Sequence, residues 1–429
     1  MKQIFKKFII AVLTYEARIL LNRTKPFIIT VTGSVGKTST KDAIFSVLKT
    51  HCHVRKSEKS FNSEIGVPLS ILGLPNAWDN PISWLKNLID GAIIAFFSKK
   101  YPEVLVLETG VDRPGDMANL ASWLRPNIVV MTRLPDVPVH VEYFSSPEAV
   151  VAEKLELLNA LKPDGVFIYN HDDEKLQSVA NEVRQNCIGY SRYTPTQFKA
   201  SADTVLYRDD VAIGSTFTLT HLDEHVQIKI MGSVGVQNTY TYGAAAAVAS
   251  QFDIPLSEVA TTLQNHQVPP GRMSLLSGLK NTLIIDDTYN SSPTAAESAL
   301  LSLKELKGAK RKIAILGDML ELGRFSSREH EKIGELVPQC ADVLITLGVR
   351  SRKTAQTALE HGMSEKVIFQ YDDVARAGRE LQSYLSPGDV VLVKASQSIR
   401  AERIVEEIMS EPERAKELLV RQDVSWKKR

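Results

Sequence analysis

Cysteine is scarce in this chain of 429 residues. Cys52, Cys187 and Cys340 lie far apart, and the sequence contains no C-x-x-C pair. This spacing indicates neither a disulfide framework nor a cysteine zinc site. We therefore expect a protein of the reducing cytoplasm.

The chain also lacks an excess of charge of either sign. It has 51 basic and 50 acidic residues, which give a formal net charge of +1. Bulk charge therefore gives no indication of a nucleic-acid partner, and we expect none. The hydrophobic fraction of 44% is ordinary for a globular protein, and the length predicts two or three domains.

Long hydrophobic runs are missing as well. The apolar run at residues 8–13 follows three lysines, and the apolar stretch at residues 84–97 is interrupted by polar residues. Neither is long enough to span a bilayer, and the first is a poor signal peptide. The favoured interpretation of residues 1–24 is an amphipathic helix that packs on the next domain. Attachment of this helix or of residues 84–97 to a membrane surface is the alternative.

The most informative segment present is a glycine-rich loop at residues 30–41. It reads TVTGSVGKTSTK, directly after the apolar strand pattern of residues 27–31 and before a helical pattern at 37–49. Val31 stands where a phosphate loop usually has its first glycine, so the motif is shortened to G-x-x-G-K-T. A turn with an incidental lysine is the alternative, but the strand–loop–helix context favours phosphate binding.

Each residue type in this loop suits a triphosphate. Gly33 and Gly36 let backbone N–H groups approach phosphate oxygens, and the helix that follows adds a favourable dipole. Lys37 would reach the β- and γ-phosphates, and Thr38 would offer its hydroxyl to Mg²⁺. The sequence therefore predicts ATP as a ligand. The full predicted loop site is Gly33, Ser34, Val35, Gly36, Lys37, Thr38 and Ser39.

Short apolar strands alternate with helices along most of the chain. This alternation predicts an α/β fold: a central P-loop ATPase domain with a parallel sheet, then a C-terminal doubly wound, Rossmann-like domain. A β-hairpin is expected within residues 216–230, and the Pro-Pro-Gly-Arg at 269–272 looks like a joint. We expect domains at residues 25–268 and 269–429. The strands expected are 27–31, 104–107, 128–131, 165–169, 283–286, 312–316, 343–346 and 390–393.

Several polar residues follow predicted strands, where parallel sheets gather ligands. Glu108 would complete a Mg²⁺ contact with Thr38, with a solvated or capping glutamate as the equal alternative. His140 and Lys154, judged on their own segments, favour a structural histidine and a solvated helix lysine. In the C-terminal half, three polar clusters follow three strands and should share one sheet edge. They are Asp286–Asp287, Gly317–Gly323 and Lys394–Ser396.

Taken together, these motifs resemble the Mur ligase superfamily, including its phosphate loop without the first glycine. Residues 62–69, 286–290 and 316–323 are most similar to the MurF branch, and the resemblance runs from about residue 25 to 410. It implies an ATP-dependent acid–amino acid ligase that forms an amide bond through an acyl phosphate. The implied reaction adds D-Ala-D-Ala to a muramoyl-peptide precursor in peptidoglycan synthesis.

The resemblance also implies residue roles. Lys37 would hold phosphates, and Thr38, Glu108, His140 and Lys154 would hold two Mg²⁺ ions, with CO₂ converting Lys154 into a carbamate. Lys37, Lys154 and His140 would be the catalytic set. Nucleotide contacts would come from Arg272 and Asp287, with Asn290 nearby. Lys394 and Ser396 resemble a late Lys-Gly-Ser motif in which Ala395 replaces the glycine.

Two departures from the family pattern leave the substrate open. Only about 30 residues precede the loop, so we expect the branch's separate UDP-sugar-binding domain to be absent. Thr241 replaces an asparagine credited with adenine contact, and Asn238 is its expected substitute. The alternatives are a MurT-like ligase that acts on a lipid-linked or other carboxylate, another amine donor, or a non-catalytic nucleotide-binding regulator. Retention of Lys37, Glu108, His140 and Lys154 argues against the regulator.

Overall fold

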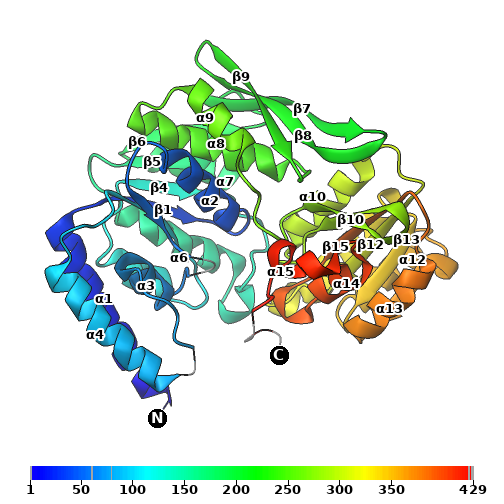
Figure 1. The fold of residues 1–429 in the computed structure, drawn as a ribbon, viewed down its shortest axis with the longest axis horizontal. Coiled ribbons are helices and arrows are strands. Elements are labelled where there is room, and N and C mark those ends of the chain that lie inside the picture. The colour runs from blue at the N-terminus through cyan, green and yellow to red at the C-terminus, as the bar shows by residue number, and fades with distance from the viewer. Residues whose placement is uncertain (1, 59–60, 79, 424–425, 427–429) are drawn as a thin grey trace.

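The computed structural model describes residues 2–58, 61–78, 80–423 and 426. These residues form two α/β units, each built on its own sheet (Figure 1). The predicted fold class is confirmed. The ranges 25–268 and 269–429 remain our proposed domain boundaries.

The first unit is built on a nine-stranded sheet in the order β2-β3-β1-β4-β5-β6-β7-β8-β9. Strands β2 to β7 pair in parallel, and β7, β8 and β9 pair antiparallel. The strands are β1 (Phe27–Thr32), β2 (Val54–Lys56), β3 (Val104–Glu108), β4 (Ile128–Met131), β5 (Val166–Asn170), β6 (Asn186–Ser191), β7 (Phe198–Arg208), β8 (Val211–His221) and β9 (Glu224–Met231).

Helices cover both faces of this sheet because the central strands are apolar on both sides. One face packs against α2, α8 and α9, and the other against α1, α3, α4, α5, α6 and α7. Their bounds are α1 (Lys2–Thr24), α2 (Lys37–Leu48), α3 (Gly66–Leu72), α4 (Pro81–Phe97), α5 (Asp116–Ala121), α6 (Pro147–Asn159), α7 (Glu174–Glu182), α8 (Gln237–Ala249) and α9 (Leu256–Gln264).

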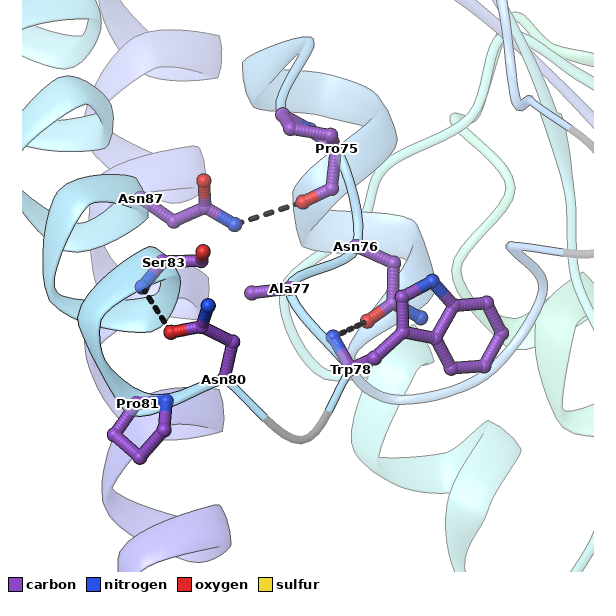
Figure 2. Close-up of a pocket in the computed structure, with 8 residues that line it drawn as sticks. All are labelled: Pro75, Asn76, Ala77, Trp78, Asn80, Pro81, Ser83 and Asn87. Atoms are coloured by element: carbon purple, nitrogen blue, oxygen red, sulfur yellow. Dashed lines mark hydrogen bonds between the residues drawn. The ribbon is translucent and has the colours of Figure 1, made fainter. Parts of the chain in front are cut away.

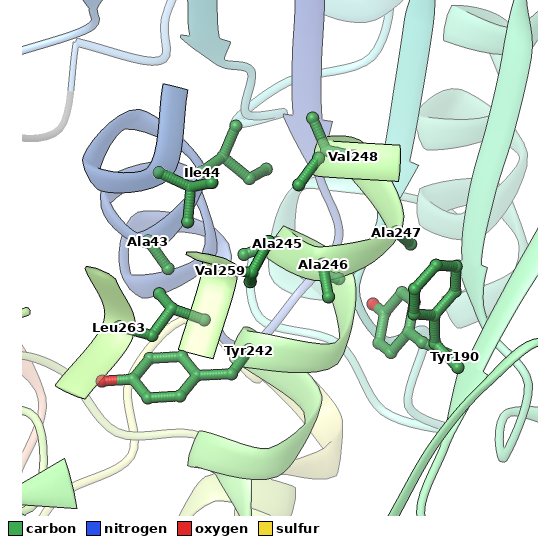
Figure 3. Close-up of a cluster of buried hydrophobic side chains, with 14 of the residues drawn as sticks. Ala43, Ile44, Tyr190, Tyr242, Ala245, Ala246, Ala247, Val248, Val259 and Leu263 are labelled. Atoms are coloured by element: carbon green, nitrogen blue, oxygen red, sulfur yellow. The ribbon is translucent and has the colours of Figure 1, made fainter. Parts of the chain in front are cut away.

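The contact between α2 and α8 fixes the helix that follows the phosphate loop. Small side chains on α8, Ala245 and Ala246 among them, let it approach Ala43 and Ile44 of α2 closely (Figure 3). Val259 of α9 lies in the same cluster. The N-terminus of α2 is therefore held by a well-packed apolar cluster.

The predicted hairpin is present as β8 and β9, but sequence patterning missed β6 and β7. Strand β6 adds a parallel strand to the ATPase sheet, and β7 begins a long antiparallel ribbon with β8 and β9. Its far end reaches the second unit, where the Tyr207 hydroxyl accepts a hydrogen bond from the Lys307 N–H at 2.8 Å. Exposed and buried residues alternate irregularly along β7, across a register shift between Ser201 and Thr204, which hides the strand from simple periodicity.

The second unit has a six-stranded sheet in the order β10-β11-β15-β12-β13-β14, all parallel except the edge strand β10. Helices α10, α11 and α12 cover one face, and α13, α14 and α15 the other. The elements are β10 (Ser274–Gly278), β11 (Thr282–Asp286), α10 (Pro293–Glu305), β12 (Arg311–Gly317), α11 (Ser326–Leu336), β13 (Val343–Leu347), α12 (Arg352–Glu360), β14 (Ile368–Tyr371), α13 (Val374–Tyr384), β15 (Asp389–Lys394), α14 (Glu402–Ile408) and α15 (Ala415–Leu418).

Candidate active site

A cavity of about 290 Å³ lies between the two units, at the carboxyl ends of the strands of both sheets. The phosphate loop and the start of α2 form one wall, and the segments after β11 and β15 form the other. Gly33 and Lys154 do not line the cavity. The predicted site residues that do are Ser34, Val35, Gly36, Lys37, Thr38, Ser39, Glu108, His140, Asn238, Arg272, Asp287 and Asn290.

The two loop glycines adopt conformations that other residues rarely take. Gly33 has φ +132°, and a Cβ built there would lie 2.1 Å from Oγ1 of Thr132. Gly36 has φ +84° and precedes the first turn of α2. The Ser34 N–H donates to the Arg133 carbonyl at 2.9 Å, which ties the loop to the end of β4. The loop conformation thus requires glycine at both positions.

Thr38 and Glu108 meet as predicted from the sequence. Thr38 lies in the first turn of α2, which follows β1, and Glu108 ends the neighbouring strand β3. The Thr38 hydroxyl donates to Oε2 of Glu108 at 2.9 Å. Asn62 donates from Nδ2 to the other carboxylate oxygen at 3.1 Å. Glu108 is buried, so its carboxylate is held in one orientation. A hydroxyl and a carboxylate side by side are hard oxygen donors of the kind that Mg²⁺ prefers.

The half-buried Lys37 lies beside this pair, and the buried Lys154 lies near Lys37. Burial lowers the pKa of Lys37, while the Glu108 carboxylate partly opposes that shift. Lys154 is only 1% exposed, and burial lowers its pKa to about 7, with the positive charge of Lys37 lowering it further. The interpretation of Lys154 as a solvated helix lysine is therefore wrong.

Helix α6 carries Lys154 inward because its neighbour Glu153 is anchored to another helix. The Glu153 carboxylate accepts hydrogen bonds from the N–H groups of Gly115, Met117 and Ala118, at 3.0, 2.8 and 3.2 Å. A carboxylate at a helix N-terminus is favourable because it satisfies free N–H groups and faces the positive end of the dipole. This anchor packs α6 against α5 and covers Lys154.

His140 lies where the two units touch. It has φ 70°, and its Nδ1 is 2.8 Å from Oε2 of Glu321, which belongs to the Gly-Asp-Met-Leu-Glu-Leu-Gly segment. Its Nε2 is 3.6 Å from Oδ1 of Asp112. Sequence reasoning placed Glu321 in the polar cluster 317–323 but did not predict its contact with His140, and it missed Asp112. Asp112 had a usable signal because it follows β3 by a few residues, whereas no pattern connects Glu321 with His140.

Arg272 brings the second unit to the phosphate loop. Its Nη2 donates to the Thr38 hydroxyl at 3.3 Å, and its guanidinium lies 3.9 Å from the ring centroid of Tyr289. Within the residues that the structure describes, Nε of Arg272 and Oγ of Ser34 are buried and make no hydrogen bond. Arg272 and Ser34 both line the cavity. Buried donors without a partner there fit a bound nucleotide, whose phosphate oxygens would accept from them.

The remaining wall is a set of paired charges. Lys394 donates from Nζ to Asp287 at 2.6 Å and to the Asn290 carbonyl at 2.9 Å, and all three residues line the cavity. Ser396 instead accepts from the Leu320 N–H at 2.9 Å, which holds the 317–323 segment. The three polar clusters therefore share one sheet edge, as predicted.

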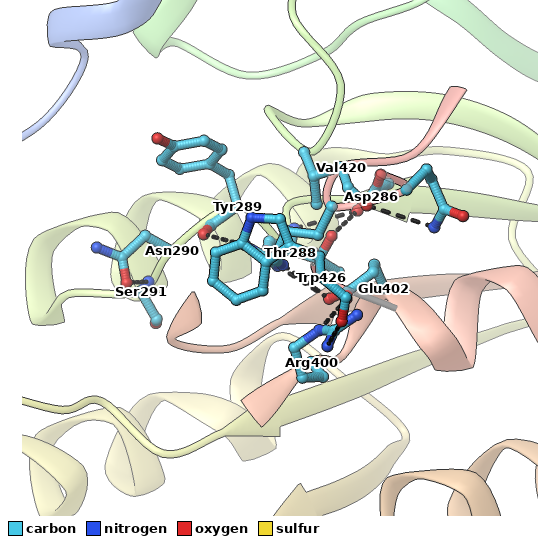
Figure 4. A network of polar contacts seen from close by, with 11 residues as sticks. Asp286, Thr288, Tyr289, Asn290, Ser291, Arg400, Glu402, Val420 and Trp426 are labelled. Atoms are coloured by element: carbon cyan, nitrogen blue, oxygen red, sulfur yellow. Dashed lines mark hydrogen bonds and ion pairs between the residues drawn. The ribbon is translucent and has the colours of Figure 1, made fainter. Parts of the chain in front are cut away.

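A second set of contacts behind this wall fixes the loop that follows β11 (Figure 4). The Arg421 guanidinium donates to the carbonyls of Thr288 and Tyr289 and to Glu402. Arg400 donates to the other oxygen of Glu402 at 2.5 Å. Because Glu402 is fully buried between two arginines, the loop that carries Tyr289 is rigidly held.

Asn238 and Thr241 both line the cavity on α8. Asn238 donates from Nδ2 to the Ser233 hydroxyl at 3.1 Å, so part of its hydrogen-bonding capacity is used within the protein. Tyr240 lies on the same wall and donates from its hydroxyl to Asp172 at 3.0 Å. The role of Asn238 at adenine remains a prediction.

Fold and site together define a P-loop nucleotide-dependent enzyme whose cavity is shared by two α/β units. Residues 31–82 and 86–249 match the Mur ligase middle domain, and residues 271–397 match the Mur ligase glutamate ligase domain. The chain belongs to the Mur ligase family, of the MurF type, and the prediction of an ATP-dependent carbon–nitrogen ligase is confirmed.

Individual relatives place the chain within that family. It is 30% identical to the UDP-N-acetylmuramoyl-tripeptide–D-alanyl-D-alanine ligase of Bacillus subtilis over 388 residues, which are 90% of this chain and 76% of that enzyme. The ligase of the same name from Mycobacterium leprae is 30% identical, over 87% of this chain and 71% of that one. A solved MurF ligase from Thermotoga maritima, in complex with ADP, superposes with a TM-score of 0.76 at 25% identity, covering 94% and 84% of the two chains.

Proposed function

We propose that this protein uses ATP and Mg²⁺ to join the carboxylate of a muramoyl-peptide to the amine of D-Ala-D-Ala. The observation that carries this proposal is the meeting of Lys37, Glu108 and Arg272 around Thr38, because it brings charges from both units to the phosphate loop. The names of the relatives supply the acceptor and the amine.

The reaction would proceed in two transfers. A carboxylate oxygen of the acceptor attacks the γ-phosphorus of ATP in line, the bond to the bridging oxygen breaks, and ADP leaves. The amine then attacks the acyl carbon of the acyl phosphate, inorganic phosphate leaves, and the amine loses a proton. Lys37 would offset charge on the transferred group, and Arg272 would hold phosphate oxygens from the opposite wall.

The donor set suits two metal ions if Lys154 is carbamylated. Thr38 and Glu108 would hold one Mg²⁺, and His140 and Lys154 the other. Bound Mg²⁺ would neutralise phosphate charge. A pKa of about 7 leaves a large share of Lys154 as the neutral amine at neutral pH, and the neutral amine is the form that adds to CO₂. Among the described residues no three His, Cys, Asp or Glu side chains cluster as a metal site. A carbamate on Lys154 would add two oxygen donors to this set.

The second unit would bind the nucleotide and exclude water. Tyr289 stacks with Arg272, and Asp287 and Asn290 are held in place by Lys394. An acyl phosphate hydrolyses in water, so contact between the units at His140 and Glu321 would protect it. In this proposal the protein acts in the cytoplasm, where ATP and the muramoyl-peptide precursor are available.

A direct assay tests the proposal. Purified protein is incubated with ATP, Mg²⁺, D-Ala-D-Ala and UDP-linked muramoyl-tripeptide, and ADP and the ligated peptide are both measured. We expect stoichiometric ADP and product, both lost when the amine or the acceptor is omitted. A parallel reaction with a lipid-linked tripeptide compares acceptors. Absence of ADP release with every acceptor would overturn ligation and favour a nucleotide-binding regulator.

A further inference from the structure

Helix α4 has an exposed apolar face. Its exposed large side chains recur every three or four residues, so they lie along one side of the helix. The opposite side is buried and carries Trp84, Asn87, Gly91 and Ala95. The exposed set consists of Ile82, Leu85, Ile89, Ile93, Phe96 and Phe97, of which Ile82 is 80% and Phe97 74% exposed.

Helix α1 lies alongside α4 and exposes further apolar side chains. Arg23 donates to the carbonyls of Ala95 and Ile94, at 3.0 and 3.1 Å, so the two helices run side by side in the same direction. Figure 1 shows the pair at the left edge of the molecule, on the side away from the second unit. We call residues 5–24 and 81–100 the helical arm. On α1 the arm exposes Phe5, Phe8 and Tyr15.

The loop before α4 adds a half-exposed tryptophan at the end of the arm. Asn80 accepts from the N–H groups of Ile82 and Ser83, and Asn87 donates to the Pro75 carbonyl at 2.7 Å, so the loop is fixed to the helix. Figure 2 shows the indole ring of Trp78 turned away from α4. Tryptophan is enriched where proteins meet the interface of a lipid bilayer.

The arm is strongly basic, although the chain as a whole is not. It contains seven basic residues and two acidic ones, while the whole chain has a formal net charge of +1, so the remainder is net acidic. Glu16, one of the two acidic residues, is buried against Gly91, and burial raises its pKa to about 7. The basic residues are Lys6, Lys7, Arg18, Arg23, Lys86, Lys99 and Lys100.

We propose that the helical arm docks this protein on the surface of a membrane that contains anionic lipid. Large apolar side chains on one face, with lysines at both ends of the helices, are the features of a helix that lies in the bilayer interface. None of the helices among the described residues is long and apolar enough to cross a membrane, so the arm would lie flat. Pairing with a second copy would bring two basic arms together and is disfavoured by repulsion.

Docking through the arm also orients the cavity region. Lys6 of α1 lines a space of about 360 Å³ together with Asp112, His140 and Glu321. The start of α1 is therefore close to His140, which we place at the reacting centre. A docked molecule presents that space beside the lipid surface.

Vesicle sedimentation tests the proposal with the full chain. At low salt, a large fraction of the protein should sediment with vesicles of phosphatidylcholine and phosphatidylglycerol. A much smaller fraction should sediment with vesicles of phosphatidylcholine alone. The triple variant Ile89→Ser, Ile93→Ser, Phe97→Ser should weaken binding to anionic vesicles by about tenfold or more, because three large apolar side chains are lost. Raising the salt concentration should weaken the wild type in the same direction.

A matched control removes exposed apolar side chains elsewhere. Leu222→Ser and Val349→Ser lie outside the arm and are as exposed as the arm residues, so vesicle binding should be unchanged. All the substituted positions are exposed, and thermal unfolding should confirm that each variant folds. The proposal would be overturned if the wild-type protein does not bind anionic vesicles, or if the triple variant binds them as the wild type does. A dimer that the triple variant abolishes, without vesicle binding, would assign the arm to a second copy instead.

Discussion

The two walls of the cavity are built in opposite ways. On the phosphate-loop side, the half-buried Lys37 lies on the cavity wall and the buried Lys154 lies behind it, and burial lowers the pKa of both. On the wall from the second unit, the buried Lys394 has a close partner in Asp287 at 2.6 Å. The lysines on the phosphate-loop side have lowered pKa values, whereas Lys394 on the opposite wall is neutralised by an ion pair.

This difference separates reaction from positioning. Because its pKa is about 7, Lys154 can change its charge or react as a neutral amine near neutral pH, which is useful at a reacting centre. The ion pair on the opposite wall does not need to change its protonation. Instead, the contacts of this wall hold Asp287 and Tyr289 in fixed places. We therefore expect substitutions on the first wall to affect turnover and those on the second to affect stability.

The largest effect should come from Lys37→Ala. Removal of a charge aimed at the transferred phosphoryl group should lower ADP formation by about 10²–10³-fold or more, with the fold retained. Lys49→Ala, at an exposed position one residue beyond the same helix, is the matched control and should leave turnover unchanged. Wild-type turnover in Lys37→Ala would remove the phosphate-loop assignment.

Lys154→Ala should abolish ligation while ATP-dependent protection against unfolding persists. Short carboxylates added to the assay should restore part of the activity, because they can occupy the place of the proposed carbamate. Initial rates with and without acetate or propionate measure this. Full activity without any added carboxylate would contradict the carbamate role.

Lys394→Ala tests the opposite wall. It leaves the Asp287 carboxylate buried without its close ammonium partner, which should cost about 3–5 kcal/mol of unfolding free energy. The double variant with Asp287→Ala should be less destabilised than the single one, and denaturant unfolding of both measures the difference. If the single variant is as stable as the wild type, Lys394 does not offset the buried charge of Asp287.

The smallest effect concerns the pH dependence of stability. Between pH 7 and its ordinary value of 10.5, Lys154 binds a proton in the unfolded chain but not in the folded one. Stability should therefore rise with pH in this window, by at most about 1.4 kcal/mol per pH unit. Denaturant unfolding in bicarbonate-free buffer should show this rise in the wild type relative to Lys154→Met. Parallel curves would show that folding does not lower the pKa of Lys154, which contradicts the prediction.

The sequence was sufficient for the parts of the site that local pattern controls. Gly33, Lys37 and Thr38 follow from strand–loop–helix order, and Glu108 follows from the end of a neighbouring strand. The contact of His140 with Glu321 was out of reach, because it depends on how two units pack. Burial of Lys154 could not be predicted either. The pattern of its helix is typical of an exposed helix, and the contact of Glu153 with α5 depends on the packing of the two helices.

The central claim is that the acceptor carboxylate is activated as an acyl phosphate on the phosphate-loop wall. The most direct test labels both carboxylate oxygens of the muramoyl-tripeptide with ¹⁸O and analyses the released inorganic phosphate by mass spectrometry. Our account predicts one ¹⁸O atom in each phosphate released during ligation. Unlabelled phosphate, formed together with ligated product, would contradict it.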